Sequence, residues 1–257
     1  MFAACSNDEH TLTQCVQFNL SDVEVIADGD ITPAMTRRKS ATLEEASVKT
    51  LFVYVDGELK RTLTPSDEDF TAPRLTLPYG QRSISFVATA QTASEYGTDV
   101  VRDAFGAVKA ITVDGSTPSQ SVTLSRIVSR LRLVVNDAIP HGLTSIEVVW
   151  PKRVLSVGAS LYGAAGGSVS AISVPASYEG RTGVGLSFYT FCPDPDEWLQ
   201  TFTVRFKAGD EVIEEREVEA PLLQNRMTII SGEWLSANRT NALTIDDGWL
   251  TDYVVEI

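Results

Sequence analysis

The sequence predicts an all-β protein that folds as two tandem antiparallel β-sandwich domains. Val, Thr and Ile together supply 65 of the 257 residues, and such β-branched side chains favour the pleated sheet over the helix. Short alternating apolar and polar runs recur about every 8–15 residues with turn-forming residues between them, a pattern typical of antiparallel sandwiches. Amphipathic helices of the length that a βαβ enzyme fold needs are not found.

The first residues resemble the end of a bacterial lipoprotein signal. Phe2-Ala3-Ala4-Cys5 places small residues before a cysteine, and in such signals that cysteine becomes lipidated after the preceding peptide is removed. The charged and apolar parts of a signal peptide do not precede it, so we expect the precursor to begin further upstream. We expect Cys5 to carry a lipid. The alternative is a cysteine that occurs by chance in an unstructured N-terminus.

The front part of the chain contains one weak strand and one clear hairpin. Residues 6–47 are polar and acidic, and Gln14–Ile26 alternates weakly within them. Leu51–Val55 has the composition of a strand, Glu58–Leu63 alternates, and Asp56-Gly57 stands between the two. Asp-Gly at this place predicts a β-hairpin, because a type I′ turn needs positive φ at both central residues.

The following segments predict two strands, a helix and a linker. Arg74–Leu77 and Ser83–Ala88 are predicted strands on either side of a turn at Pro78-Tyr79-Gly80. Val100–Val108 is predicted to be a short helix. Asp114–Ser119 combines Asp, Gly, Ser and Pro, and this composition predicts a linker.

The second half of the chain repeats the alternating pattern. Apolar residues occupy every other position in Ser129–Val135, Ile146–Trp150 and Phe202–Phe206. A turn at Gly209-Asp210 then leads into Val212–Val218, whose many charges suit the edge of a sheet.

We place the boundary between the two sandwiches near residue 125. Residues 1–40 are then a lipoprotein-like tail with a possible first strand, 41–125 form the N-terminal sandwich and 126–257 form the C-terminal one. Both sandwiches have an ordinary domain size.

Charge and histidine content narrow the possible functions. The chain has 21 Lys and Arg against 34 Asp and Glu, a net charge of −13, which argues against a nucleic-acid partner because phosphates select clustered Lys and Arg. His10 and His141 are the two histidines, so His-based metal sites and catalytic triads are nearly excluded, and His141 is interpreted as a surface turn residue. We expect no enzyme activity, no cofactor and no metal.

Three acidic clusters and one glycine-rich segment are candidates for calcium, catalytic or phosphate sites. Asp28-Gly29-Asp30, Asp194–Glu197 and Asp246-Asp247 lack the ligand rhythm of a calcium loop and the separation of glycosidase carboxylates, so they are interpreted as solvated loops. Gly158–Gly167 contains no Gly-Lys-Ser/Thr, so it is interpreted as a mobile loop rather than a phosphate loop.

Three arginines and two cysteines have no predicted functional role. Arg126, Arg130 and Arg132 are predicted to line the outer face of a strand as solvated charges. Cys15 and Cys192 could pair in an oxidising compartment, but Cys192 is better interpreted as a small buried apolar residue.

Several motifs together resemble the fimbrillin-like proteins of Bacteroidetes, the subunits of type V pili. The resemblance depends on the order of these motifs after the lipoprotein-like start, and it covers most of the chain. It implies two transthyretin-like β-sandwich domains and no catalysis. The motifs are Thr36-Arg37-Arg38, Val48–Val55, Leu77–Gly80, Ser125–Leu133 and Pro221–Gly232.

The resemblance also implies a way of assembly. Polymerising subunits of the family are exported as lipoproteins and cut after an arginine near the N-terminus by a trypsin-like protease. Loss of the first strand leaves a groove, which a strand from another subunit fills by β-strand addition. Arg37 and Arg38 are the candidate cleavage sites here. The alternative is that both arginines are simply solvated in a polar tail.

The C-terminus carries an alternating apolar stripe of five residues. The stripe is either the last strand of this protein or a donor strand for a neighbouring subunit, and both interpretations stay open. Its residues are Trp249, Thr251, Tyr253, Val255 and Ile257.

From these features we expect a cell-surface fimbrial subunit, in an anchor, tip or stalk role, which is held at the outer membrane by a lipid on Cys5 at least initially. Its expected partners are other fimbrial subunits and host or bacterial surface ligands. The alternative is a glycan- or ligand-binding lipoprotein of the same architecture, with Trp198, Trp234 or Trp249 as sugar platforms. A hydrolase would require two carboxylates that converge in a deep cleft.

Overall fold

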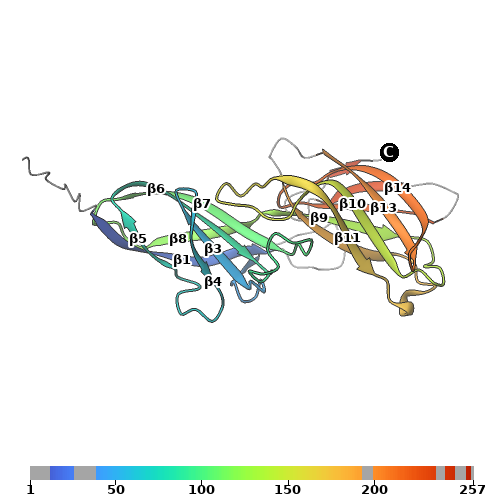
Figure 1. The fold of residues 1–257 in the computed structure, drawn as a ribbon, viewed down its shortest axis with the longest axis horizontal. Coiled ribbons are helices and arrows are strands. Elements are labelled where there is room, and N and C mark those ends of the chain that lie inside the picture. The colour runs from blue at the N-terminus through green and yellow to red at the C-terminus, as the bar shows by residue number, and fades with distance from the viewer. Residues whose placement is uncertain (1–11, 26–38, 193–198, 236–240, 247–252, 256–257) are drawn as a thin grey trace, which may run out of the picture.

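The fold consists of two β-sandwiches that lie end to end along the longest axis of the molecule (Figure 1). It is taken from a computed structural model, which describes residues 12–25, 39–192, 199–235, 241–246 and 253–255. The described elements are strands, apart from the single-turn 3₁₀ helix η1 (Ala176–Tyr178). The predicted fold class is therefore confirmed.

The N-terminal sandwich is formed by strands β1 to β8. Their hydrogen-bonded order is β2-β1-β8-β7-β6-β3-β4, and β5 also pairs with β1. β7 and β8 pair only at Phe105–Arg126 and Gly106–Ser125, so the sheet opens into two layers. The bounds are β1 Thr13–Val25, β2 Lys39–Ala41, β3 Thr50–Val55, β4 Glu58–Leu63, β5 Arg74–Pro78, β6 Gly80–Thr89, β7 Ala104–Val113 and β8 Gln120–Arg126.

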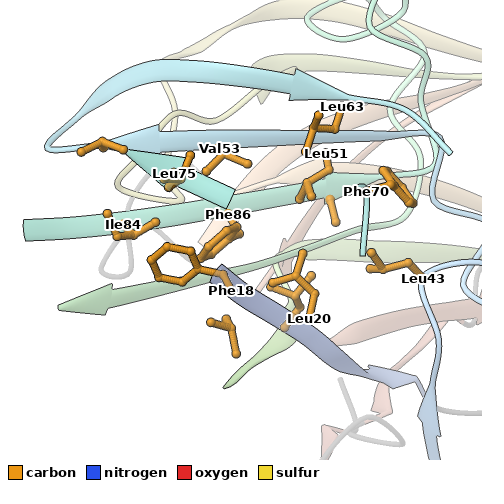
Figure 2. Close-up of a cluster of buried hydrophobic side chains, with 14 of the residues drawn as sticks. Phe18, Leu20, Leu43, Leu51, Val53, Leu63, Phe70, Leu75, Ile84 and Phe86 are labelled. Atoms are coloured by element: carbon orange, nitrogen blue, oxygen red, sulfur yellow. The ribbon is translucent and has the colours of Figure 1, made fainter. Parts of the chain in front are cut away.

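The core of this sandwich lies between the layer of β1, β5 and β8 and the layer of β3, β6 and β7. Figure 2 shows Phe18 and Leu20 of β1 pointing into the same cluster as Leu51 of β3 and Phe86 of β6. The first strand thus supplies core side chains, and the alternation that predicted it weakly is a genuine burial pattern.

The C-terminal sandwich is formed by strands β9 to β17. Their order is β14-β13-β10-β12-β9-β15-β16-β17, with β11 paired to β10. β10 and β12 meet at the single pair Val154–Phe191, so this sheet also folds into two layers. The bounds are β9 Val128–Val135, β10 Ser145–Val154, β11 Ala165–Ser173, β12 Val184–Phe191, β13 Leu199–Ala208, β14 Glu211–Pro221, β15 Met227–Gly232, β16 Asn241–Asp246 and β17 Tyr253–Val255.

Several local predictions are confirmed. Asp56 and Gly57 have φ of 51° and 90°, and they join β3 to β4 as an antiparallel hairpin. The alternating apolar residues of β9, β10 and β13 face the second core. The charged strand β14 is the edge of its sheet. The sandwiches are antiparallel except for the pairs β1–β8 and β9–β15, which are parallel.

Three local predictions are wrong. Val100–Val108 is not helical: β7 begins at Ala104, and a Cβ on Gly106 would lie 3.0 Å from the Phe86 carbonyl oxygen, so this glycine is required by close packing. Asp114–Ser119 is not a linker but the turn between β7 and β8, closed by the Asp114 side chain, which accepts from Ser116 N at 2.9 Å. Gly158–Gly167 is not entirely loop, because β11 begins at Ala165.

Candidate functional site

The first strand is inserted between strands that lie far from it in the sequence. β1 pairs antiparallel with β5 through Thr13–Gln17 and parallel with β8 through Phe18–Val23. Its last residues, Val23–Val25, pair antiparallel with β2. Because β1 is hydrogen-bonded along both edges, it is an interior strand of its layer rather than an added edge.

The buried side chains of β1 follow an uneven spacing. Val16, Phe18 and Leu20 alternate along the strand and face the core. The register against β8 then shifts between Leu20 and Asp22, so that Ser21 is an extra residue on β1. This bulge returns Val23 to the core face, and Val23 is 1% exposed although an uninterrupted strand would turn it outward.

Phe18 is the largest of these buried side chains. It is 0% exposed, and its ring packs on that of Phe86 with centroids 5.4 Å apart and an interplanar angle of 55° (Figure 2). Such tilted aromatic pairs add to the free energy of burial. Phe18 therefore anchors β1 to the opposite layer of the sandwich.

Polar contacts fix both halves of the strand. The Gln14 amide donates to the carbonyl of Thr117 at 2.8 Å and accepts from Gly115 N at 3.0 Å, which ties the start of β1 to the β7–β8 turn. The backbone N–H groups of Phe18 and Leu20 donate to carbonyl oxygens of the segment before β5, at 3.0 Å each. The register of β1 is thus defined by backbone and side chain together.

The segment from β2 to β3 has contacts of its own that do not involve β1. β2 pairs with β1 alone among the described strands, but the turn that follows it is closed by its own side chains. Thr42 N donates to the Glu45 carboxylate at 2.9 Å and Glu45 N donates to Thr42 Oγ1 at 3.1 Å. Leu43 and Val48 are buried in the core. The chain from residue 42 onward therefore has contacts that do not depend on the first strand.

The predicted processing sites lie outside the described residues. Arg37 and Arg38 fall between Val25, where β1 ends, and Lys39, where β2 begins. Cys5 precedes the first described residue. Their positions in the sequence are thus known relative to β1, and their predicted roles stay predictions.

The C-terminal stripe is described in part. Tyr253 and Val255 belong to β17, which pairs antiparallel with β16 opposite Ile245 and Leu243. The other members of the stripe lie outside the described residues: Trp249, Thr251 and Ile257. β17 pairs with its neighbour through three residue positions, and it stands at the end of the sheet order.

A third apolar cluster, the junction, joins the two sandwiches. It includes Phe52 and Val87 from the N-terminal sandwich and Val154 and Phe191 from the C-terminal one. Tyr96, in the loop between β6 and β7, packs on both Phe52 and Phe191, with ring centroids 4.6 Å and 6.0 Å apart. The two domains thus share a small core of their own.

Hydrogen bonds from the same loop reinforce the junction. The Tyr96 hydroxyl donates to the Val157 carbonyl at 2.8 Å and accepts from Val157 N at 2.9 Å. Arg153 Nη1 donates to the Asp99 carbonyl at 3.0 Å, and Ser168 Oγ donates to the Asp99 carboxylate at 2.5 Å. Burial raises the pKa of Tyr96 and lowers the pKa of Arg153 to about 10.

Arg126 is not the solvated charge that the sequence predicted. Its side chain is 6% exposed at the end of β8. Nε and Nη2 donate to the two oxygens of Asp103 at 2.6 and 2.5 Å, and the guanidinium lies 5.1 Å from the Phe105 ring centroid. The alternation of β8 turns this residue inward, and a carboxylate from the β6–β7 loop neutralises it. Arg130 and Arg132 are half-buried on β9.

Features that would indicate catalysis or metal binding are not seen among the described residues. His141 is 90% exposed and its Nδ1 lies 2.9 Å from Glu179. No group of three or more His, Cys, Asp or Glu side chains in the described ranges could hold a metal ion. Cys15 and Cys192 are both free, Cys15 exposed and Cys192 buried, so the pairing considered from the sequence is wrong.

The two tryptophans within the described residues give no support to a sugar platform. Trp150 and Trp234 are both buried in the second core, and the indole N–H of Trp234 donates to the Val134 carbonyl at 3.0 Å. Trp234 was one of the three predicted platforms. Trp198 and Trp249 lie outside the described residues. No described helix is long and apolar enough to cross a membrane.

Sequence comparison assigns the chain to a family. Residues 76–257 match the family described as a family of unknown function, DUF6562. The chain belongs to this family. No curated protein matches this DUF6562 member in sequence.

Comparison with solved structures shows a protein whose fold is similar to that of this DUF6562 protein. A "putative cell adhesion protein" from Bacteroides ovatus matches with a TM-score of 0.52 and 13% identity, over 96% of this chain and 100% of that one. The fimbrial anchor protein Mfa2 from Porphyromonas gingivalis matches with a TM-score of 0.46 and 12% identity, over 94% and 100%. The tip fimbrial protein Mfa3 of the same organism matches with 0.44 and 14%, over 94% and 99%. The resemblance to Bacteroidetes proteins is confirmed at the level of the fold.

Two structural features were not predicted from the sequence: the bulge in β1 and the junction between the sandwiches. The bulge at Ser21 could have been inferred from the spacing of Val16, Phe18, Leu20 and Val23, because a three-residue step after two two-residue steps signals an extra residue. The junction had no local signal, since Tyr96 and its partner Val157 stand far apart in the sequence.

Proposed function

We propose that this protein is a cell-surface fimbrial subunit, acting as an anchor, tip or stalk component, which assembles by β-strand exchange with other subunits and supports adhesion. The observation that carries the proposal is the position of β1. It is an N-terminal strand, it fills the interior of a layer, and its partners are the distant strands β5 and β8. Its removal would leave a gap that only another strand can fill.

The energetics of that gap favour a replacement strand. Without β1, the edges of β5 and β8 would present unpaired backbone groups, and the side chains around Phe18 would face water. Both carry a free-energy cost, since open strand edges and exposed apolar cores promote association with other chains. An incoming strand restores the backbone hydrogen bonds and fills the same core positions.

The candidate cleavage sites stand at a suitable place in the sequence for such an exchange. A cut after Arg37 or Arg38 separates β1 from the rest of the chain and leaves β2 with the main body. The buried side chain of Leu43 and the hydrogen bond from Lys49 N to the Thr89 carbonyl at 2.8 Å hold the new N-terminal segment to the first sandwich. Processing would therefore release one strand without removing the contacts that follow it.

The location and the partners complete the proposal. A lipid on Cys5 holds the precursor at the outer membrane, and a cut after Arg37 or Arg38 frees the subunit from that lipid. A subunit that stays uncut remains as an anchor. The partners are other fimbrial subunits, one of which receives or supplies the exchanged strand, and surface ligands of host or bacterial cells. The shared fold with the Bacteroides ovatus protein supports an adhesive role.

Limited proteolysis tests the proposal. Low doses of trypsin are expected to nick the native chain after Arg37 or Arg38, and size-exclusion chromatography with light scattering is expected to show assembled species after the nick. The matched control carries Arg37→Gln, Arg38→Gln and Lys39→Gln, because trypsin also cuts after the adjacent lysine, and it should remain uncut in this segment and monomeric. An uncut wild-type protein, or a cut protein that stays monomeric with β1 bound, would overturn the polymerising role.

The lipid anchor is tested separately. We expect the wild-type precursor, expressed with its own export signal, to partition with membranes and the Cys5→Ala variant to partition with the soluble fraction. Equal partition of the two proteins would refute anchoring at Cys5 without affecting strand exchange.

A further inference from the structure

Strand β11 is an edge strand that carries no charged side chain. It pairs with β10 and with no other described strand, and the two lie side by side in the C-terminal sandwich (Figure 1). Its nine residues, Ala165–Ser173, contain no Asp, Glu, Lys, Arg or Pro. Proteins commonly protect an exposed edge with charged side chains or proline, because an open edge can pair with another chain. β11 has neither protection.

The other edge of the same layer is protected by charge. β14 carries five glutamates and one arginine in its eleven residues. Two copies of the chain that met at β14 would place like charges opposite one another, which is unfavourable. Around β11 the surface is closer to neutral, because Glu147, opposite Ala171 on β10, forms an ion pair with Lys207 at 3.1 Å. In a chain of net charge −13, contact between two copies therefore meets less repulsion at β11 than at β14.

The open backbone groups of β11 can be identified from its pairing with β10. Val174 N, immediately after the strand, donates to the Thr144 carbonyl at 2.8 Å. Backbone groups of an antiparallel strand face its two sides alternately. Every second residue, counting back from Ile172, therefore directs its N–H and C=O groups to β10. The residues between them direct these groups to the open edge: Gly167, Val169, Ala171 and Ser173.

The side chains of β11 leave this edge accessible to another backbone. Ser170 points toward the core, where its Oγ accepts from the Trp150 indole N–H at 2.9 Å. Val169, the preceding residue, lies on the outer face and is 45% exposed. A Cβ on Gly166 would meet no heavy atom within 4 Å, and neither Gly166 nor Gly167 has a positive φ. The fold of the chain thus does not require these two glycines, and glycine within a strand often marks the close approach of another backbone.

We propose that β11 is a homodimer interface, at which two copies of the chain pair antiparallel about a two-fold axis at Val169. The occupant of the open edge is thus the β11 strand of a second copy, and the two outer layers become one continuous sheet. The interface uses the uncut chain and is independent of strand exchange at β1.

The register centred on Val169 aligns the whole of β11 with itself. Val169 lies opposite its own copy, and Gly167 lies opposite Ala171 of the second copy on each side of the axis. Because the backbone groups of these residues face the open edge, the three pairs exchange about six hydrogen bonds. Ile172, the largest side chain of the strand, lies opposite Gly166 and meets no side chain there. The strand is therefore complementary to itself, as a two-fold interface requires.

The strength of the contact follows from its size. The side chains of β11 are small, so the dimer buries less area than a standard interface, and we expect a dissociation constant of ~100 µM. The chain is then monomeric at the low micromolar concentrations of the proteolysis assay, and dimers form as its concentration rises.

Disulfide trapping tests the register on the full chain. The background carries Cys5→Ser and Cys15→Ser, and the remaining Cys192 is buried. Opposite residues of an antiparallel pair have Cα atoms about 4.5–5.5 Å apart, a separation that a disulfide can span. Val169→Cys is therefore expected to form a covalent dimer under mild oxidation.

Two controls define what the trapping reports. Val108→Cys, on a strand of the other sandwich and 53% exposed, measures random collision, and Val169→Cys should cross-link at least ~10-fold faster because pairing raises the local thiol concentration. In the proposed register the two copies of Ser173 lie roughly 27 Å apart. Ser173→Cys should therefore form no dimer by itself, but it should form one when mixed with Ala165→Cys.

A charge exchange at the axis tests whether the two copies of Val169 face each other. Val169→Lys and Val169→Asp should each dimerise at least ~10-fold more weakly than the wild type, because like charges then lie directly opposite. An equimolar mixture of the two variants should recover the dimer. Sedimentation velocity over a concentration series measures both effects, and circular dichroism checks that each variant is folded.

The outcomes decide the proposal. Cross-linking of Ser173→Cys with itself at the rate of Val169→Cys would overturn the antiparallel register. Cross-linking of Val169→Cys no faster than Val108→Cys, or charge variants that dimerise as the wild type does, would overturn the interface at β11. None of these results bears on strand exchange, whose own test uses cleavage before β2.

Discussion

Replacing Phe18 by alanine is the sharpest test of how strongly β1 is held. Phe18 is 0% exposed and packs on Phe86 at 5.4 Å. Removing a buried phenylalanine ring costs about 3–5 kcal/mol. Since β1 is hydrogen-bonded along both edges, the backbone cannot move inward to fill the cavity, and we expect the upper part of that range.

The loss is measured by urea unfolding followed by far-ultraviolet circular dichroism. All four tryptophans lie in the second half of the chain, so their fluorescence reports the C-terminal sandwich and serves as an internal comparison. Leu12→Ala is the matched control, because Leu12 is 64% exposed and its truncation should change the free energy of unfolding by less than about 0.5 kcal/mol. A loss below about 1 kcal/mol for Phe18→Ala would refute the role of Phe18 as the anchor of β1.

Four further predictions concern the junction and the titratable groups. Tyr96→Phe removes both hydrogen bonds to Val157 and is expected to lower the free energy of unfolding by about 1–3 kcal/mol; an unchanged urea midpoint would contradict this. Asp103→Ala leaves the buried Arg126 without its bidentate carboxylate and is expected to lower the free energy of unfolding by about 3 kcal/mol. A change of less than about 0.5 kcal/mol, which is typical of surface substitutions, would show that the pair does not stabilise the fold. Burial raises the pKa of the Cys192 thiol to about 12, so in the Cys5→Ser chain a maleimide at neutral pH should label Cys15 and leave Cys192 unmodified until urea is added; labelling of Cys192 in the native protein would disprove its burial. The hydrogen bond from Arg61 holds the pKa of Asp69 below its ordinary value, so the pair stabilises the protein above that ordinary value and the effect is lost as the pH falls through the folded-state pKa; Arg61→Ala should therefore destabilise the protein more at pH ~7 than at pH ~2, and an equal effect at both would contradict this.

The sequence predicts those parts of the fold that depend on local patterns. Asp56-Gly57 was sufficient for the first hairpin because both residues need positive φ there. The core faces of β9, β10 and β13 follow from strict alternation. Where two local signals conflict, prediction fails: Val100–Val108 contains a short apolar run that suits a helix or a strand, and its long pairing with β6 determines the outcome.

The candidate site depends more on contacts between distant residues. A strand near Gln14–Ile26 was predicted, but the sequence does not show that β5 and β8 lie on its two sides. Arg126 was assigned to solvent because its partner Asp103 belongs to another segment. The junction around Tyr96 was not predicted at all, because its partners come from both sandwiches. Such contacts between distant segments cannot be deduced from the local pattern of one sequence.

The replacement of β1 is tested most directly by following a label on the strand itself. In the Cys5→Ser chain, a dye on the exposed Cys15 marks β1, since Cys192 is buried. After cleavage between residues 26 and 38, the account predicts that the dye elutes with a small fragment while the assembled fraction contains unlabelled chains. A dye that remains bound to each cut chain in the assembled fraction would contradict strand exchange at this site.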